Sequence, residues 1–333
     1  MKKNTKLYET AATLLEPGKG ILAADESDPT AGKRLAMVHL PNEPENRQDF
    51  REILFTAPDI EKYISGVIMY DSSIRNTTDD GIPFPDVLTA RGIVPGIKVD
   101  LGTRELQGFK GEVVTQGLDN LADRFAEYYD MGARFAKWRM VVTIDEDRTP
   151  TYEAVKMNCM MMARYAQLAQ AADIVPIVEP EVIHAGDHTL EKAEIETTRT
   201  LQILFQTLQE YKVDMAGLIL KSSMVLAGDV AAEQTSAEEV AQATLRTFHM
   251  SVPHDCAGIV FLSGGQSPER STENLNAIAK MGSQPWPITF SFSRALEEPV
   301  LKAWDGKPEN VEAAKAAMAE VAKQNSEASL GKL

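Results

Sequence analysis

Lysines and carboxylates recur at the ends of short apolar runs in this sequence, several of them two residues apart. The residues concerned are the pairs Lys98/Asp100, Lys137/Arg139 and Glu179/Glu181, together with Asp25 and Lys221. Residues i and i+2 of a strand point to the same face of a sheet, so each pair would share a face. A structural ion pair explains one such pair equally well. Burying several lysines is costly unless they are paired or used, which favours a functional site for the whole set.

A nucleophilic lysine is the first chemistry that this set suggests. A free lysine has a pKa of about 10.4, so only about one in two thousand is neutral at pH 7. Burial and neighbouring cations both favour the neutral amine. Lys137 and Arg139 would therefore activate Lys221 for attack on a ketone.

Carboxylates would complete the reaction. Glu179 or Glu181, as a carboxylic acid, would protonate the carbinolamine oxygen so that water can leave. The resulting iminium ion is an electron sink that lets a neighbouring C–C bond break, while Asp25 takes the proton from the departing hydroxyl. These residues predict a Schiff-base aldolase that needs no metal or other cofactor.

Eight apolar runs must position these side chains. They are 20–25, 65–71, 93–100, 134–139, 173–181, 216–221, 257–263 and 288–294, with polar, helix-like stretches between most of them. Such continuous runs are typical of buried parallel strands. Eight strands alternating with helices predict a (β/α)8 TIM barrel, an α/β fold whose catalytic groups gather where the strands end. Trp138 and Pro180, between the paired residues, would face the surrounding helices.

The chain length fits one domain. Barrels of this kind have roughly 200–400 residues, so we expect a single barrel domain over residues 1–333. An N-terminal segment, 1–17, and a C-terminal helix at about 308–329 are expected to pack outside the barrel. The spacing of apolar residues also predicts helices at 118–131 and 237–248, and the methionine-rich stretch 157–165 suggests a core helix.

The composition of the chain limits the classes of molecule that this protein is expected to bind. A net charge of −15 argues against nucleic acid and makes a local cluster of Lys and Arg a candidate site for a small anion. No apolar run approaches the roughly 20 residues of a membrane span, and the basic N-terminus leads into a mixed segment rather than a signal-peptide core. Cys159 and Cys256 form no close-spaced motif and are expected to be reduced core residues. We therefore predict a cytoplasmic protein that binds neither membrane nor nucleic acid.

Two shorter patterns point to other functions. Residues 262–266 have the same sequence, LSGGQ, as the signature loop of ABC transporter ATPases. The P-loop motif that those ATPases also need does not occur in the sequence. His184 and His188 have a spacing that a metal site can use, but they fall on a polar, glycine-containing stretch that favours a solvated loop.

Longer motifs resemble those of a known family, the class I fructose-bisphosphate aldolases. The matching segments, in chain order, are GKGILAADES (18–27), GIKVD (96–100), AKWR (136–139), IVPIVEPE (174–181), Leu220–Lys221 with Met224–Val225, and FLSGGQS (261–267). The resemblance extends from about Leu7 to Lys332. It implies the same barrel and the same Schiff-base chemistry.

The resemblance also implies a role for each catalytic candidate. Lys221 would form the Schiff base, and Glu179 would be the acid–base group for imine formation, with Glu181 beside it. Lys137 would contact the substrate and help that step. Asp25 would serve C–C cleavage.

Phosphate ligands follow from the same resemblance. Lys98 and Arg139 would hold the phosphate at C6 of the sugar. The phosphate at C1 would be held by Ser263, the backbone of Gly264, and Arg294, in agreement with the phosphate sites that often lie after strands seven and eight of such barrels. Lys33 and Arg34 match a basic pair that lies near the phosphates in the family.

The sequence departs from the family at two places. Eukaryotic members have a C-terminal tail ending in a tyrosine that helps proton exchange on the bound enamine, and this sequence stops at Leu333, about where that tail would begin. We therefore expect water or another side chain to serve that step. In the segment Ser291-Phe292-Ser293-Arg294, Phe292 and Ser293 replace the usual Tyr-Gly, which removes a hydroxyl and alters the backbone approach to the C1 phosphate.

The predicted function is reversible aldol cleavage of fructose 1,6-bisphosphate to dihydroxyacetone phosphate and glyceraldehyde 3-phosphate, in glycolysis and gluconeogenesis. One alternative is the same chemistry on other ketose phosphates, such as sedoheptulose bisphosphate. Another is a binding or scaffold protein that keeps the barrel, against which the intact Lys221, Glu179 and Asp25 argue. The expected partners are a sugar phosphate and further copies of the chain, because the family is commonly oligomeric.

Overall fold

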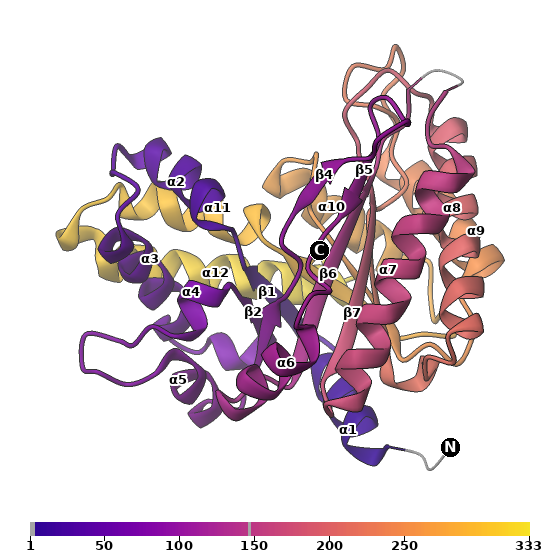
Figure 1. Cartoon of the computed structure of the whole chain (residues 1–333). Coiled ribbons are helices and arrows are strands. Elements are labelled where there is room, and N and C mark those ends of the chain that lie inside the picture. Colours follow the sequence, from indigo (N-terminus) through magenta and orange to yellow (C-terminus); the bar gives the residue numbers. More distant parts are fainter. Residues whose placement is uncertain (1–3, 146–147) are drawn as a thin grey trace.

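Eight strands pair in parallel and close into a barrel within residues 4–145 and 148–333, which the computed structural model describes (Figure 1). In order around the barrel they are β1 (Gly20–Ala24), β2 (Ile64–Met69), β3 (Val94–Lys98), β6 (Phe135–Val142), β7 (Val175–Val182), β8 (Ile219–Ser222), β9 (Gly258–Phe261) and β10 (Ile288–Phe292). Most of their residues are buried, because the interior covers one face and helices cover the other. The (β/α)8 fold and all eight predicted strands are confirmed.

Several strand boundaries differ from the prediction. β2, β3, β9 and β10 end two residues earlier than predicted, so Asp100, Ser263 and Arg294 lie just beyond their strands. β6 and β7 continue past Arg139 and Glu181, so these two side chains lie within the strands near their carboxyl ends. The run expected from residue 216 begins instead as a short 3-10 turn, Met215–Gly217, and β8 starts at Ile219.

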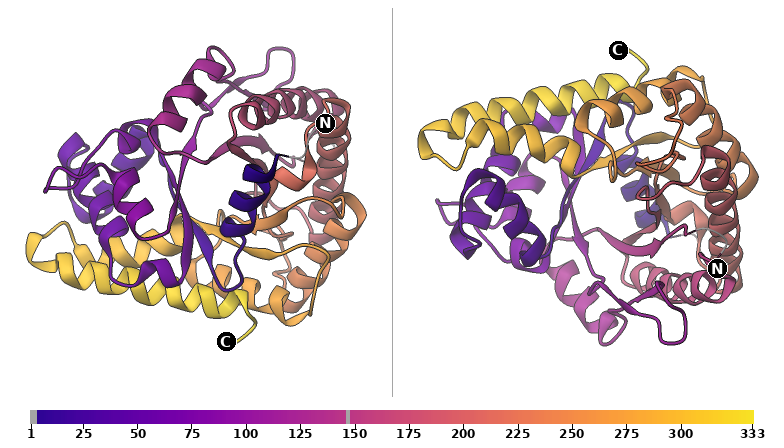
Figure 2. Two further views of the ribbon diagram at one scale, coloured as in Figure 1. Left: turned by 90° about the horizontal axis from the view of Figure 1, so that it is seen from below. Right: turned by 90° about the horizontal axis from the view of Figure 1, so that it is seen from above.

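Helices surround the barrel (Figure 2). They are α2 (Asp28–Leu35), α3 (Pro44–Thr56), α4 (Asp71–Ile74), α5 (Phe84–Ala90), α6 (Leu121–Asp130), α7 (Tyr152–Ala171), α8 (Leu190–Glu210), α9 (Ala237–Ser251), α10 (Pro268–Lys280) and α11 (Arg294–Trp304). A small antiparallel hairpin, β4 (Thr103–Glu105) and β5 (Val113–Thr115), follows β3. The two predicted internal helices are present as α6 and α9, and a capping box of Ser236 and Glu239 begins α9.

The methionine-rich stretch lies in α7, and only part of it is core. Met162 and Tyr165 are buried, whereas Met157 and Met160 are exposed. The expectation of a core helix was therefore wrong for the outer face, because a helix outside a barrel buries one side only. Trp138 stacks on Tyr165 at 5.5 Å between ring centroids, so its predicted outward orientation is confirmed.

α1 (Thr5–Leu14) closes the amino-terminal end of the barrel. Seen from below in Figure 2, it crosses the centre of the ring of strands. Leu7, Ala11 and Leu14 share one helix face and belong to a buried cluster with inward-facing strand residues, among them Phe135 and Ile177. This helix therefore forms a floor opposite the end where the catalytic candidates lie. Residues 1–3 of the predicted N-terminal segment lie outside the described residues.

Two glycines make room for the large side chains of this floor. A Cβ on Gly96 would lie 2.3 Å from the Phe135 ring, and one on Gly66 would lie 2.5 Å from Leu14 Cδ2. Strand glycines often mark such close approaches. The floor is consequently packed with no space for larger residues at these positions.

α12 (Val311–Ser329), preceded by a 3-10 turn at Pro308–Asn310, runs along the outside of the barrel (Figure 2). It packs against α3, α10 and α11. The buried residues Ala314, Met318 and Ala322 recur every four positions and form its inner face.

Cys159 and Cys256 are free and buried, as predicted. In the part of the chain that the structure describes, no helix is long and apolar enough to cross a membrane.

Candidate active site

Four buried charged groups meet at the carboxyl ends of the strands. Lys137 Nζ, from β6, lies 2.7 Å from Asp25 Oδ2, just after β1, and 3.1 Å from Glu179 Oε2 on β7. Lys221 Nζ, from β8, lies 3.3 Å from the other oxygen of Glu179. The barrel therefore brings four of the predicted catalytic residues together into one chain of ionic contacts.

Charge states in this cluster follow from the pairing. Burial by itself would raise the pKa of Glu179, but Lys137, Lys221 and Arg139 outweigh it and lower that pKa to about 2. Burial would likewise lower the pKa of Lys137, but the carboxylates of Asp25 and Glu179 raise it above its ordinary value. Glu179 is thus a carboxylate and Lys137 an ammonium in this form of the site.

Glu181 makes a different contact from Glu179. Arg139 Nε donates a hydrogen bond to Glu181 Oε2. Burial would lower the pKa of Arg139, but Glu181 outweighs it and raises that pKa. Glu181 is therefore engaged with a cation that reaches toward solvent, whereas Glu179 is the glutamate that contacts Lys221.

Lys98 Nζ lies 2.9 Å from Asp100 Oδ1. Because β3 ends at Lys98, Asp100 lies beyond the strand, and the predicted shared strand face does not describe this pair. Asp100 Oδ2 also accepts a hydrogen bond from the backbone N–H of Arg139, at 3.2 Å. Asp100 thus links the Lys98 ammonium to the backbone of Arg139, although β3 and β6 are separated in sequence.

The other phosphate candidates lie together where β9 and β10 end. Ser263 Oγ is 3.5 Å from the backbone N–H of Ala295, in the first turn of α11. Arg294 Nη2 donates to the carbonyl of Gln266 at 2.8 Å. A Cβ on Gly264 would lie 2.8 Å from Glu181 Oε1, so glycine lets this loop approach the site closely. A helix N-terminus with a glycine loop is a favourable setting for an anion.

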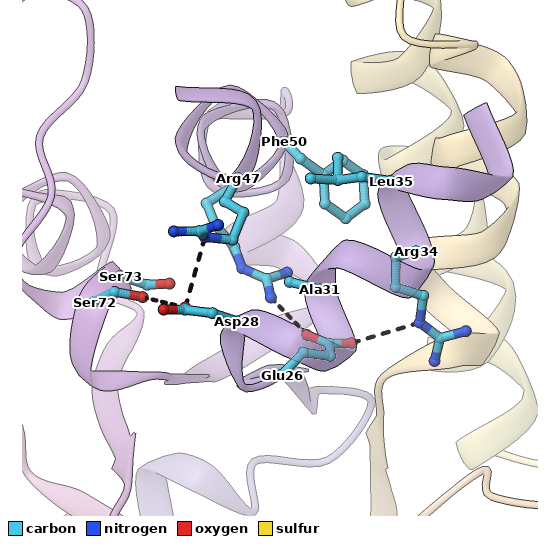
Figure 3. Close-up of a pocket in the computed structure, with 10 residues that line it drawn as sticks. Glu26, Asp28, Ala31, Arg34, Leu35, Arg47, Phe50, Ser72 and Ser73 are labelled. Carbon is cyan, nitrogen blue, oxygen red and sulfur yellow. Dashed lines mark hydrogen bonds and ion pairs between the residues drawn. The ribbon is translucent and has the colours of Figure 1, made fainter. Parts of the chain in front are cut away.

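Lys33 and Arg34 lie on α2 and differ in their ionic contacts. Arg34 Nε lies 3.9 Å from Glu26 Oε1 at a pocket that Figure 3 shows. Lys33 is exposed and forms none of the ion pairs found among the described residues. The structure therefore brings Arg34, but not Lys33, into contact with other charged groups near the site.

Sequence reasoning missed a second buried cluster next to the first. Glu26, Arg51, Ser293 and Glu297 contact one another there, and we call them the Glu26 cluster. A signal was present in the helical spacing: Arg51 precedes Leu54 and Phe55, and Glu297 precedes Val300 and Leu301. Each charged residue thus occupies the apolar face of its helix.

The two histidines with metal-like spacing lie on the loop between β7 and α8. Among the described residues, no three His, Cys, Asp or Glu side chains are arranged to hold a metal ion.

Comparisons with known proteins agree with this geometry. Residues 6–333 match the family model described as fructose-bisphosphate aldolase class-I. The chain is 48% identical to a fructose-bisphosphate aldolase of Echinococcus multilocularis, over 99% of this chain and 92% of that protein. It is also 48% identical to a probable class 1 fructose-bisphosphate aldolase of Xanthomonas axonopodis pv. citri, over 98% of each. Among solved structures, a Plasmodium falciparum fructose-bisphosphate aldolase, crystallised with TRAP and a small-molecule inhibitor, has a TM-score of 0.97 and 42% identity, over 98% of this chain and 95% of that one.

Proposed function

The chain belongs to the class I fructose-bisphosphate aldolase family, and we propose that Lys221 is the lysine through which it cleaves its substrate. The reaction is reversible aldol cleavage of fructose 1,6-bisphosphate to dihydroxyacetone phosphate and glyceraldehyde 3-phosphate. The observation that supports the assignment is the contact of Lys221 with a single ionised carboxylate, Glu179, at the mouth of the barrel.

Imine formation begins with a proton transfer. The Glu179 carboxylate, 3.3 Å from Lys221 Nζ, accepts the ammonium proton and leaves a neutral amine that attacks the C2 carbonyl. The proton now on Glu179 then goes to the carbinolamine oxygen, which departs as water. The sequence suggested an acid at this position; in the proposed mechanism the residue acts first as a base.

Lys137 supports this step as a permanent cation. Its ammonium contacts the second oxygen of Glu179 at 3.1 Å and so holds the Glu179 carboxylate in its ionised form beside Lys221. The carboxylate of Asp25, held 2.7 Å from Lys137, takes the proton of the C4 hydroxyl while the C3–C4 bond breaks. The electrons of that bond move into the iminium, which becomes an enamine.

Two phosphate sites flank the cluster in this proposal. Lys98 and Arg139 hold the C6 phosphate; what supports this is that Asp100 links the Lys98 ammonium to the backbone of Arg139. Ser263, the Gly264 N–H and Arg294 hold the C1 phosphate, supported by their position at the start of α11. The nearby Arg34 and exposed Lys33 supply further positive charge around the phosphates.

We also propose that the enzyme is cytoplasmic and forms a homo-oligomer. Similar proteins of Arabidopsis thaliana and Cicer arietinum are named as cytosolic or cytoplasmic forms, which supports a cytoplasmic enzyme. The family resemblance supports a homo-oligomer. Light scattering on the purified protein would show a multiple of the chain mass, whereas a monomer at micromolar concentration would contradict this proposal.

Borohydride trapping tests the nucleophile. Reduction in the presence of dihydroxyacetone phosphate should place the adduct on Lys221 alone, as read by peptide mapping. Lys221→Met should give no adduct and no cleavage, while the control Lys62→Met, at an exposed lysine, should match the parent enzyme. Because the iminium supplies the electron sink, activity should persist in EDTA. An adduct on Lys98 or Lys137 would overturn the assignment.

A further inference from the structure

The Glu26 cluster has no part in the proposed reaction, yet two of its residues are direct neighbours of site residues in the sequence. Arg51 Nη2 lies 2.6 Å from Glu26 Oε2, and Arg51 Nη1 lies 2.8 Å from Glu297 Oε1. Ser293 Oγ donates to Glu26 Oε1 at 2.7 Å. Figure 3 shows Arg34 reaching the Glu26 carboxylate at the pocket, through Oε1 of Glu26. Arg51 contacts the other oxygen of the same carboxylate, Oε2.

These side chains tie three distant segments together. Glu26 follows β1, and Arg51 lies on α3. Ser293 directly precedes α11, and Glu297 lies in its first turn. The side chains of Glu26, Arg51 and Glu297 are only 6%, 4% and 0% exposed. Buried charges are stable only while their partners stay in place, so the cluster resists relative movement of the three segments.

The neighbours of the cluster in sequence are the functional residues. Glu26 directly follows Asp25, and Ser293 directly precedes Arg294. We infer that Glu26 is a positioning residue that, through its bond with Ser293, sets the spacing between Asp25 and Arg294. That spacing is the one between the bond to be cleaved and the C1 phosphate, so the inference rests on the proposed function.

Charge makes this bond stronger than one between neutral groups. Burial alone would raise the pKa of Glu26, but Arg51 outweighs it and lowers that pKa to about 2. Burial and the nearby Glu26 carboxylate together raise the pKa of Glu297. Glu26 is therefore the ionised member of the pair, and the Ser293 hydroxyl donates to a full negative charge.

The consequence for catalysis is geometric. Small misplacements of reacting groups are costly, about a hundredfold in rate for 1 Å. Without its hydroxyl, residue 293, which directly precedes α11, loses its side-chain hydrogen bond to the segment that carries Asp25. Substrates that are held by the C1 phosphate should then sit less accurately against Asp25 and Lys221.

Ser293→Ala tests the inference by removing this hydroxyl. We expect kcat/KM for fructose 1,6-bisphosphate and for fructose 1-phosphate to fall about tenfold, because the positioning is partly lost. Ser293→Thr, which keeps a hydroxyl, should restore most of the activity. Ser72→Ala is the matched control, because it removes a hydroxyl that bonds a carboxylate in the same region, that of Asp28, without joining the two segments.

A second readout separates positioning from a merely structural role. Borohydride trapping at Lys221 should weaken in Ser293→Ala with dihydroxyacetone phosphate but not with dihydroxyacetone, which has no phosphate. Equal weakening with both, or a lowered melting temperature with unchanged kinetics, would overturn the inference. Ser293→Gly repeats the test if the alanine variant does not fold.

The parent enzyme keeps the two proposals distinguishable. If it gives no adduct at Lys221, the proposed function fails, whatever the variants do. If it traps and cleaves normally while Ser293→Ala is indistinguishable from it, only the positioning role of Glu26 is wrong.

Discussion

Single residues at this mouth share a property: three of the cations, Lys98, Lys137 and Arg139, already contact a carboxylate before substrate arrives. Lys98 pairs with Asp100, Arg139 with Glu181, and Lys137 with both Asp25 and Glu179. The pairing removes the repulsion that clustered cations would otherwise impose. It also means that a substrate phosphate must compete with an internal carboxylate for its ligands.

Arg139→Ala should therefore have a substrate-dependent effect. A charge-assisted contact to the C6 phosphate is worth about 1.5–3 kcal/mol, so kcat/KM for fructose 1,6-bisphosphate should fall roughly ten- to a hundredfold. Fructose 1-phosphate, which lacks that phosphate, should lose little. Steady-state kinetics with both substrates measure the difference.

Arg139→Lys is the matched control, because it keeps the charge and loses the forked geometry. Its kcat/KM for fructose 1,6-bisphosphate should lie between those of the parent enzyme and the alanine variant. Equal losses on both substrates would show that Arg139 acts on the reaction centre instead of on the C6 phosphate.

Whole elements divide the barrel into a working end and a supporting end. The strand ends and the loops after β9 and β10 form the mouth, and α1 forms the floor (Figure 2). Leu14 is completely buried on α1, against Gly66 of β2. Stability and catalysis should therefore respond separately to changes at the two ends.

Leu14→Ala is expected to destabilise the protein without changing its chemistry. Truncating a buried leucine costs about 2–5 kcal/mol, because transfer energy is lost and a cavity remains. Urea unfolding should show this loss in the free energy of unfolding. The kcat of the folded variant should match that of the parent enzyme.

Leu330→Ala, at an exposed position near the end of α12, is the control and should leave stability nearly unchanged. A large fall in kcat for Leu14→Ala, with its unfolding curve unmoved, would contradict the separation of floor and mouth.

At the scale of the whole molecule, the Glu26 cluster joins segments from the two ends of the chain, and it makes the free energy of unfolding depend on pH. Glu297 has a raised pKa in the folded protein, since burial and Glu26 both favour its protonated form. The unfolded chain releases that proton above about pH 4.3. Between this value and the raised folded pKa, the folded state binds more protons, so the contribution of Glu297 to stability falls as pH rises.

Glu297→Gln should remove this pH dependence. An amide resembles the protonated acid in shape, and it can still accept from Arg51 and donate to Glu26. We expect the variant to be at least as stable as the parent at pH 7.5, with an advantage that shrinks toward pH 4.5, as followed by thermal unfolding across that range.

Glu26→Gln serves as the opposing control. Glu26 is the ionised partner of Arg51, so its loss leaves a buried guanidinium without its counter-charge, and stability should fall. If both glutamine variants lowered stability equally at neutral pH, the assignment of the proton to Glu297 would be wrong.

Local geometry explains which features of the structure could be predicted from the sequence. The eight apolar runs became eight strands, because strand burial and period-two alternation are properties of neighbouring residues. Trp138 faces outward onto Tyr165 for the same reason. The family resemblance identified the candidate lysine without any coordinates.

Contacts between strands were decided only by the closed barrel. Lys137 and Arg139 share a strand, yet they contact different carboxylates, because neighbouring strands and their stagger determine which side chains meet. The ionised state of Glu179 likewise depends on three cations from other positions. The Glu26 cluster joins residues 26, 51, 293 and 297, whose proximity arises only when the first strand closes against the last. Sequence determined which groups are present and which way they point; closure of the barrel determined their partners and their charges.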